Sequence, residues 1–169
     1  MDPLNLNTIA IKSPIEDSLD ALNEVISKAT VVKPNVSEAS VGWHIEHALL
    51  VAEFSAEALQ ERVSTKSSMS QIVTKKLFFL LKYIPRKSAK APKVVCPAEQ
   101  NPKVNDLQHH LNEVIVKLQK TTNAPANLYF HHPKLGVINT KETLEFIVIH
   151  NEHHLKIIRD ILAKKNHAV

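Results

Sequence analysis

The chain has 169 residues, of which 44% are hydrophobic and 22% charged, and this length and balance predict a single globular domain over residues 1–169. Its single cysteine, Cys96, excludes an internal disulfide framework and favours a reducing, cytoplasmic location. Met1–Thr8 lacks the pattern of a secretion signal, and no apolar run approaches the roughly 20 residues that span a bilayer, so we expect no stable membrane insertion.

The net charge of +4 is unevenly distributed along the chain. Residues 62–98 contain nine basic and no acidic side chains, whereas all 17 acidic residues lie outside this stretch. The sequence therefore predicts an acidic body with one basic insert, over residues 64–98. This pattern excludes a uniformly basic nucleic-acid-binding protein, and no nucleic-acid partner is expected.

Two long helices are predicted before the insert. The motif Ser13-Pro14-Ile15-Glu16 combines an N-cap, a first-turn proline and a capping-box glutamate, and apolar residues continue at helical spacing to about Ala29. The second helix is expected to begin near Ser37–Ser40 and to fade at residues 63–65. One stripe of this helix carries His47 among apolar residues, so we expect His47 to face the interior.

Within the insert, the sequence predicts a short helix over Met69–Ile84, ended by Pro85, and then an extended loop. Lysines beside the apolar run Leu77–Leu81 resemble a membrane-surface helix. The alternative hypothesis is that the apolar residues dock on the body while the lysines are solvated. Exposed apolar residues in the insert would also provide a surface for a homodimer.

A third long helix is predicted from residues 101–104 to Thr121, followed by a loop over residues 123–139 in which Gly136 takes a positive φ. Asn139 and Glu142 then form a capping box for the last helix, which should reach Lys164. The predicted fold is all-α: an up-and-down four-helix bundle, with a short extra helix and a long loop between the second and third long helices.

Three histidines in this bundle predict a metal site. His150 and His154 are four residues apart, so they share one helical face, and His47 can meet them from a facing helix. Three neutral imidazoles with open coordination positions are the ligand set of a reactive divalent-metal site. The alternative is that the spacing arises by chance and that these are core histidines without a metal.

Other residues near the triad have candidate roles at the edge of the site. His44 lies one turn from His47 and is either a fourth ligand or a neighbour that supports one. His132 either forms part of a structural turn or lies at the site edge, and Trp43 is expected in the core beside the site. Asn151 is predicted to orient a ligand imidazole, and His153 to lie at the flank of its helix.

The same residues resemble a known superfamily. The stretches His132-Pro133-x-x-Gly136, Thr140-x-Glu142 and His150-x-x-His153-His154 resemble the end of DinB-like proteins, whose last helix reads H-x-x-H-H after an H-P-x-x-G turn. Trp43-His44-x-x-His47 resembles an earlier helix of that superfamily, where one histidine completes a triad. The resemblance covers most of the chain and is most specific over residues 130–160, and the insert is similar to that of a subgroup of uncharacterised bacterial members.

The resemblance implies a four-helix bundle with a three-histidine divalent-metal site, matched here by His47, His150 and His154. Characterised relatives of this type include metal-dependent transferases that use low-molecular-weight thiols, such as bacillithiol and mycothiol, and a maleylpyruvate isomerase. The extra histidines His44 and His153 leave the identity of the ligand nitrogens open.

We therefore expect a metal-dependent transferase that acts on a small-molecule substrate. A divalent cation in the triad would bind a thiol, lower its pKa and present the anion to an electrophile. Zinc, nickel, iron and manganese all accept imidazole ligands, so the sequence does not select the metal. Metal-assisted hydrolysis and a non-enzymatic binding bundle with a vestigial site are the alternatives, and no catalytic residue is assigned beyond the ligands.

Overall fold

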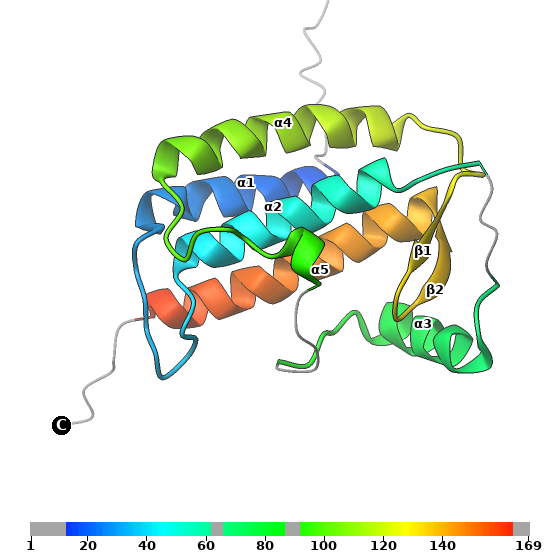
Figure 1. The fold of residues 1–169 in the computed structure, drawn as a ribbon, viewed down its shortest axis with the longest axis horizontal. Coiled ribbons are helices and arrows are strands. Elements are labelled where there is room, and N and C mark those ends of the chain that lie inside the picture. Colours follow the sequence, from blue (N-terminus) through cyan, green and yellow to red (C-terminus); the bar gives the residue numbers. More distant parts are fainter. Residues whose placement is uncertain (1–12, 62–65, 87–91, 164–169) are drawn as a thin grey trace, which may run out of the picture.

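The computed structural model describes residues 13–61, 66–86 and 92–163 (Figure 1), so the expectations for Met1–Thr8 and for the part of the extended loop at 87–91 lie outside it. The second long helix ends at Glu57, short of the expected end at residues 63–65. The described chain is mostly helical. Its helices, 3₁₀ turns and strands are, in order, α1 Pro14–Val25, η1 Ile26–Lys28, α2 Val41–Glu57, α3 Met69–Leu81, η2 Lys93–Val95, α4 Val104–Thr122, β1 Tyr129–His132, β2 Gly136–Asn139 and α5 Thr140–Leu162.

Local sequence explains where most of these helices begin. Ser13, Ser68 and Asn139 each accept a hydrogen bond from the backbone three residues on, and in each case a Glu or Gln side chain at that third position completes a capping box. Ser40 caps α2 in the same way without the reciprocal bond. The predicted starts of the first, second and last long helices are therefore confirmed to within a residue or a few.

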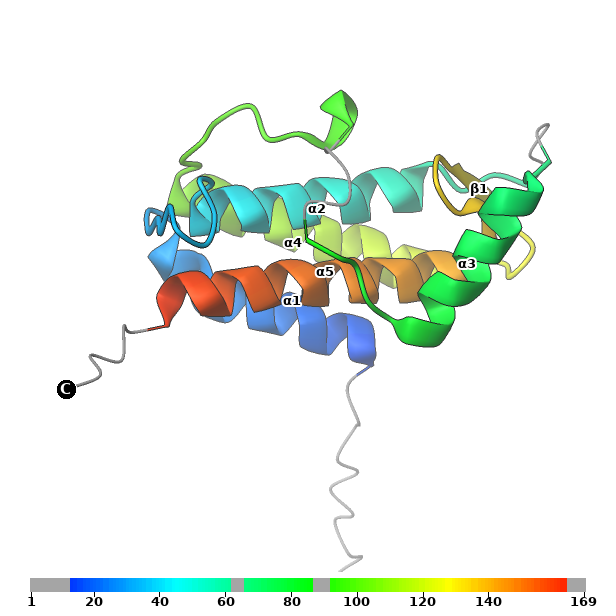
Figure 2. The same ribbon diagram turned by 90° about the horizontal axis from the view of Figure 1, so that it is seen from below.

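The helices α1, α2, α4 and α5 pack side by side around a shared apolar core (Figures 1 and 2). Leu22, Ile45, Leu111 and Leu155 are among its most deeply buried side chains, with one contributed by each helix. No helix among the described residues combines the length and apolar character needed to cross a membrane.

The order of helix directions differs from the expected up-and-down alternation. The pairs Glu46–His110 and Glu53–Lys117 both join residues 64 positions apart, and this constant offset means that α2 and α4 run parallel. In Figure 1, α4 begins at the end of the bundle where α2 also begins. The expected alternation is therefore wrong, because the insert is long enough to act as a crossover.

The segment predicted as a loop before the last helix contains a β-hairpin, so the all-α description is imprecise. β1 and β2 pair antiparallel, with Tyr129 opposite Asn139 and His132 opposite Gly136. Phe130 and Ile138 face each other across the pair and are both buried. Gly136 has the predicted positive φ, 70°, and a Cβ there would lie 2.4 Å from Ser67 Oγ, so the turn requires glycine.

The insert helix α3 docks through a face that mixes apolar and charged side chains. Lys75 and Lys82 form 3.0 Å ion pairs with Glu142 and Glu145 of α5, and Arg86 pairs with Asp160. The apolar side chains on the other side of the helix remain exposed, although Phe78 and Phe79 pack partly on the core. The hypothesis that the apolar residues dock and the lysines are solvated is therefore confirmed only in part: Phe78 and Phe79 dock and Lys82 is exposed, but the leucines also remain exposed. The helix ends at Leu81 because Lys82 adopts a left-handed conformation.

Candidate metal centre

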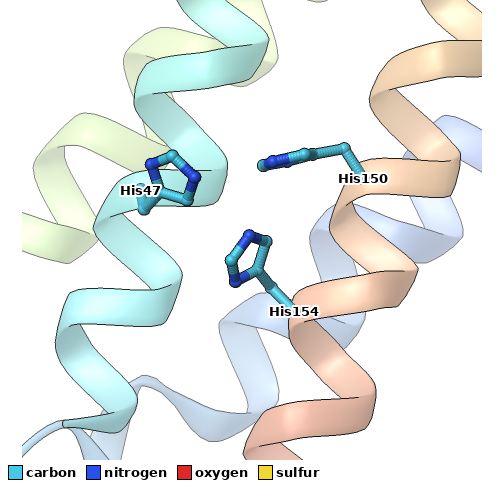
Figure 3. Close-up of side chains that lie close together, drawn as sticks. All are labelled: His47, His150 and His154. Carbon is cyan, nitrogen blue, oxygen red and sulfur yellow. The ribbon is translucent and has the colours of Figure 1, made fainter. Parts of the chain in front are cut away.

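The three histidines of the predicted triad lie together between α2 and α5 (Figure 3). Their ring centroids are 4.6 Å apart for His150 and His154, 4.8 Å for His47 and His154, and 5.2 Å for His47 and His150. One nitrogen from each ring lies within 4.8 Å of the others. The helical i,i+4 spacing and the antiparallel contact of α2 with α5 thus bring all three imidazoles to one point.

His47 is held in one orientation by a backbone hydrogen bond. Its Nδ1–H donates to the carbonyl oxygen of Val95 in η2, at 2.7 Å, which leaves the lone pair of Nε2 free to bind a metal. Trp43 stacks on the same ring, with centroids 5.2 Å apart. Trp43 is expected in the core, but it is only half-buried, and its ring lies against that of His47.

His154 is the first member of a chain of hydrogen bonds that leads away from the triad. Its Nδ1 lies 3.0 Å from Nδ1 of His44, and Nε2 of His44 lies 2.9 Å from Oγ of Ser37. With both rings neutral, two tautomer arrangements satisfy these contacts. Only one of them, with His154 donating to His44 and His44 donating to Ser37, leaves Nε2 of His154 free for a metal.

The position of His44 therefore resolves the two roles left open by the sequence. Among the described residues, the group that can hold a metal contains His47, His150 and His154 but not His44. His44 uses both ring nitrogens in the hydrogen-bond chain, so in this structure it contacts His154 and lies outside the triad. Burial is the main reason that the pKa of His44 is lowered to about 4, which keeps the ring neutral at pH 7.

His150 gives the clearest indication that a ligand belongs here. Its Nδ1 is buried and has no hydrogen-bond partner among the described residues. A buried nitrogen without a partner costs free energy, and a cation bound at Nδ1 would remove this cost. Burial is also the main cause of the lowered pKa values of His47, His150 and His154, so all three rings present neutral nitrogens, as metal ligands must.

The donor set thus fits a divalent metal ion. It contains three imidazoles and no carboxylate or thiolate, and Cys96, though close in sequence to Val95, is exposed and outside the group. Three protein ligands leave coordination positions open for water or a substrate, which distinguishes reactive sites from closed structural ones. What this arrangement can do chemically is bind a cation and leave part of its coordination sphere open.

His132 has the structural role that the sequence left as one of two alternatives. Its Nδ1 accepts hydrogen bonds from the backbone N–H groups of Lys134 and Leu135, both at 3.1 Å, and so fixes the hairpin turn. The ring also packs 4.7 Å from Phe146, whose own ring lies 5.8 Å from that of His150. One aromatic side chain therefore separates His132 from the triad.

Two further residues of α5 lie away from the triad. Asn151 is fully buried, and its side-chain amide donates to Ser18 Oγ of α1 at 3.1 Å, so the prediction that it orients a ligand imidazole is wrong. The reason is helical geometry, because residue 151 points about 100° away from residue 150. His153 hydrogen-bonds the backbone of Ile84, which agrees with its predicted place at the helix flank.

Sequence reasoning missed Val95 and Ser37, which hydrogen-bond Nδ1 of His47 and Nε2 of His44. Val95 contributes only a backbone carbonyl, and no sequence pattern marks such an acceptor 48 positions from its partner. Ser37 looked like part of a helix start, but it precedes the helix and faces His44 instead. The available signal for Ser37 was a polar side chain seven residues before His44, a candidate ligand.

Comparisons with curated proteins and with solved structures give no match. A family described as "Protein of unknown function (DUF1569)" matches residues 13–161, a range that includes the triad, His44 and Ser37. Because this match covers most of the sequence, the chain belongs to the DUF1569 family.

Proposed function

We propose that this protein is a divalent-metal-dependent enzyme of the DinB-like type, a transferase that activates a low-molecular-weight thiol for attack on a small electrophile. The observation that carries the proposal is the convergence of three neutral imidazoles, one of which has a buried nitrogen without a partner. The packing of four long helices around this triad fits what the DinB-like resemblance implies.

His47, His150 and His154 would hold the cation. When bound, it would lower the pKa of a thiol or water in an open position and so supply a nucleophile near neutral pH. The chain's own residues orient the ligands: Val95 fixes the ring of His47 and His44 fixes that of His154. Trp43 covers one side of His47 and limits the access of water to that face.

The surroundings of the triad favour a thiol over water as the nucleophile. The carboxylates next to the ligands in sequence are engaged elsewhere, since Glu46 pairs with His110 and Glu152 with Arg159. A site without a nearby general base activates the more acidic group more readily, and a thiol with a pKa of about 8.5 needs a far smaller shift than water. Metal-assisted hydrolysis is therefore the second candidate.

The test uses protein purified without an affinity tag and reloaded with zinc, nickel, iron or manganese. We expect about one equivalent of metal per chain and metal-dependent conjugation of glutathione or cysteine to an aryl chloride, in which sulfur displaces chloride. His150→Ala should lose both, whereas His109→Ala, an exposed histidine on α4, should keep both. Ester cleavage without a thiol would instead support the hydrolase.

Two results would contradict the proposal. Metal content below about a tenth of an equivalent after reloading would defeat both enzymatic functions and leave a non-enzymatic binding bundle. If the protein is fully loaded with metal but catalyses neither conjugation nor ester cleavage with several thiols and electrophiles, it binds a metal but does not have the proposed activity.

A further inference from the structure

The insert helix α3 presents an apolar surface that the bundle does not cover. Its exposed side chains, here called the α3 apolar face, are Met69, Val73, Leu77, Leu80 and Leu81, each between 52% and 77% exposed. These positions follow helical spacing and lie on one side of the helix. A contiguous exposed apolar patch of this kind marks an interaction surface in a soluble domain.

The orientation of α3 is fixed by contacts on its opposite side. Lys75 donates to the carbonyl oxygen of Val137 at 3.0 Å and pairs with Glu142, and Gln71 donates to the carbonyl oxygen of Pro133 at 3.1 Å. Lys82 adds the ion pair with Glu145. Polar contacts to the hairpin and α5 therefore hold the helix with its leucines exposed. Figure 2 shows α3 at the edge of the bundle.

The sequence around this face is basic, and the acidic residues near it, Glu142 and Glu145 of α5, are paired with Lys75 and Lys82 on the docked side. No acidic residue occurs anywhere in residues 62–98, and Lys66 and Lys76 are exposed close to the apolar side chains in sequence. On the helix, Lys76 falls within about 20° of Met69, at the border of the face. An apolar stripe with an exposed lysine, Lys76, at its border matches a surface that is apolar inside and anionic at its rim.

We propose that the α3 apolar face docks on the surface of a membrane that contains anionic lipids, with the helix lying in the plane of the headgroups. Leucine side chains would enter the boundary of the acyl chains while the lysines contact anionic headgroups. The helix ends after Leu81 and is far too short to span a bilayer, so the contact is peripheral.

A second copy of the chain is a poorer occupant of the same face. In a two-fold symmetric dimer the same patch meets itself, so the exposed Lys76 side chains of the two copies would border one apolar contact, while Glu142 and Glu145 are already paired with Lys75 and Lys82. Like charges across an interface oppose association. The membrane supplies both an apolar layer and the opposite charge, which is why the charge distribution favours it over a homodimer.

Vesicle flotation of the full chain tests this inference independently of the metal site. The wild-type chain should float with vesicles of phosphatidylcholine and phosphatidylglycerol, bind phosphatidylcholine alone weakly, and lose binding as salt increases. Leu77→Ser and Leu80→Ser should each weaken binding about tenfold, and Lys76→Glu about fivefold or more. Val116→Ser, which changes an equally exposed valine on α4, is the matched control and should bind like the wild type.

Circular dichroism is used to check that each variant is folded. If a leucine variant does not fold, the comparison of Lys76→Glu with the wild type is the test. Absence of binding to anionic vesicles would overturn the inference, as would equal binding by the leucine variants and the wild type. Light scattering tests the dimer. If the wild type is a dimer, Leu80→Ser is a monomer and neither binds vesicles, a second copy of the chain occupies the face and the membrane inference is overturned.

Discussion

Replacement of His44 tests how the site controls its ligand nitrogens. In the structure, His44 bridges Nδ1 of His154 at 3.0 Å and Oγ of Ser37 at 2.9 Å. His44→Leu removes the acceptor that holds His154 in the tautomer with a free Nε2, and it leaves a buried N–H without a partner. Loss of such a support to a metal-binding histidine typically lowers metal affinity about 10- to 100-fold, and we expect a loss in this range.

Affinity is measured by competition between the protein and a chromophoric chelator for zinc, and the visible spectrum of the cobalt-loaded protein reports the ligand set. His44→Gln is the conservative variant, because its amide oxygen can accept from His154 and its amide nitrogen can donate to Ser37. It should recover most of the lost affinity and the wild-type cobalt spectrum. His109→Leu, at an exposed histidine on α4, should leave both unchanged.

Two results would refute this reasoning. If His44→Leu binds zinc as tightly as the wild type, the hydrogen bond does not control the ligand tautomer. If His44→Gln is as weak as His44→Leu while both are folded, the ring of His44 acts by packing and not by its hydrogen bonds.

Three further predictions concern the frame around the site. The hydrogen bond to Glu46 is the main cause of the raised pKa of His110. This pair should therefore stabilise the fold below about pH 6.5, and that stability should be lost as the pH rises through the raised pKa. The free energies of urea unfolding of the wild type and His110→Gln, measured across about pH 6–9, should converge at the alkaline end. Gly136→Ala should cost about 1–3 kcal/mol in urea unfolding, because alanine is strained at φ 70° and its Cβ would meet Ser67; an undiminished stability would contradict the described turn. Asn151→Ala should cost about 1–3 kcal/mol by losing a buried hydrogen bond while zinc affinity stays unchanged, and a large loss of affinity would restore the orienting role.

The parts of the fold that local sequence encodes were predictable. Capping boxes marked the starts of α1 and α5, and their apolar spacing gave the buried faces. The triad was predictable for the same reason, because His150 and His154 need only helical geometry to share a face. His47 was assigned from its position on an apolar stripe, which the structure places against α5.

The features that depend on contacts distant in sequence were not predictable in this way. The parallel course of α2 and α4 follows from how the insert crosses the bundle, which no local pattern specifies. The hairpin strands have four residues each, too few for alternation to stand out beside the turn. The leucines of α3 lie outward because Phe78, Phe79 and the ion pair of Lys75 occupy the docked face, and helical spacing alone does not indicate which face will dock.

The most direct test of the central claim is anomalous diffraction from crystals of tag-free protein loaded with zinc, recorded on both sides of the zinc absorption edge. We predict one strong anomalous peak about 2 Å from a nitrogen of each of His47, His150 and His154, with His44 outside the coordination sphere. A peak elsewhere on the molecule, or none between α2 and α5 in fully loaded crystals, would contradict the claim that these imidazoles form a metal centre.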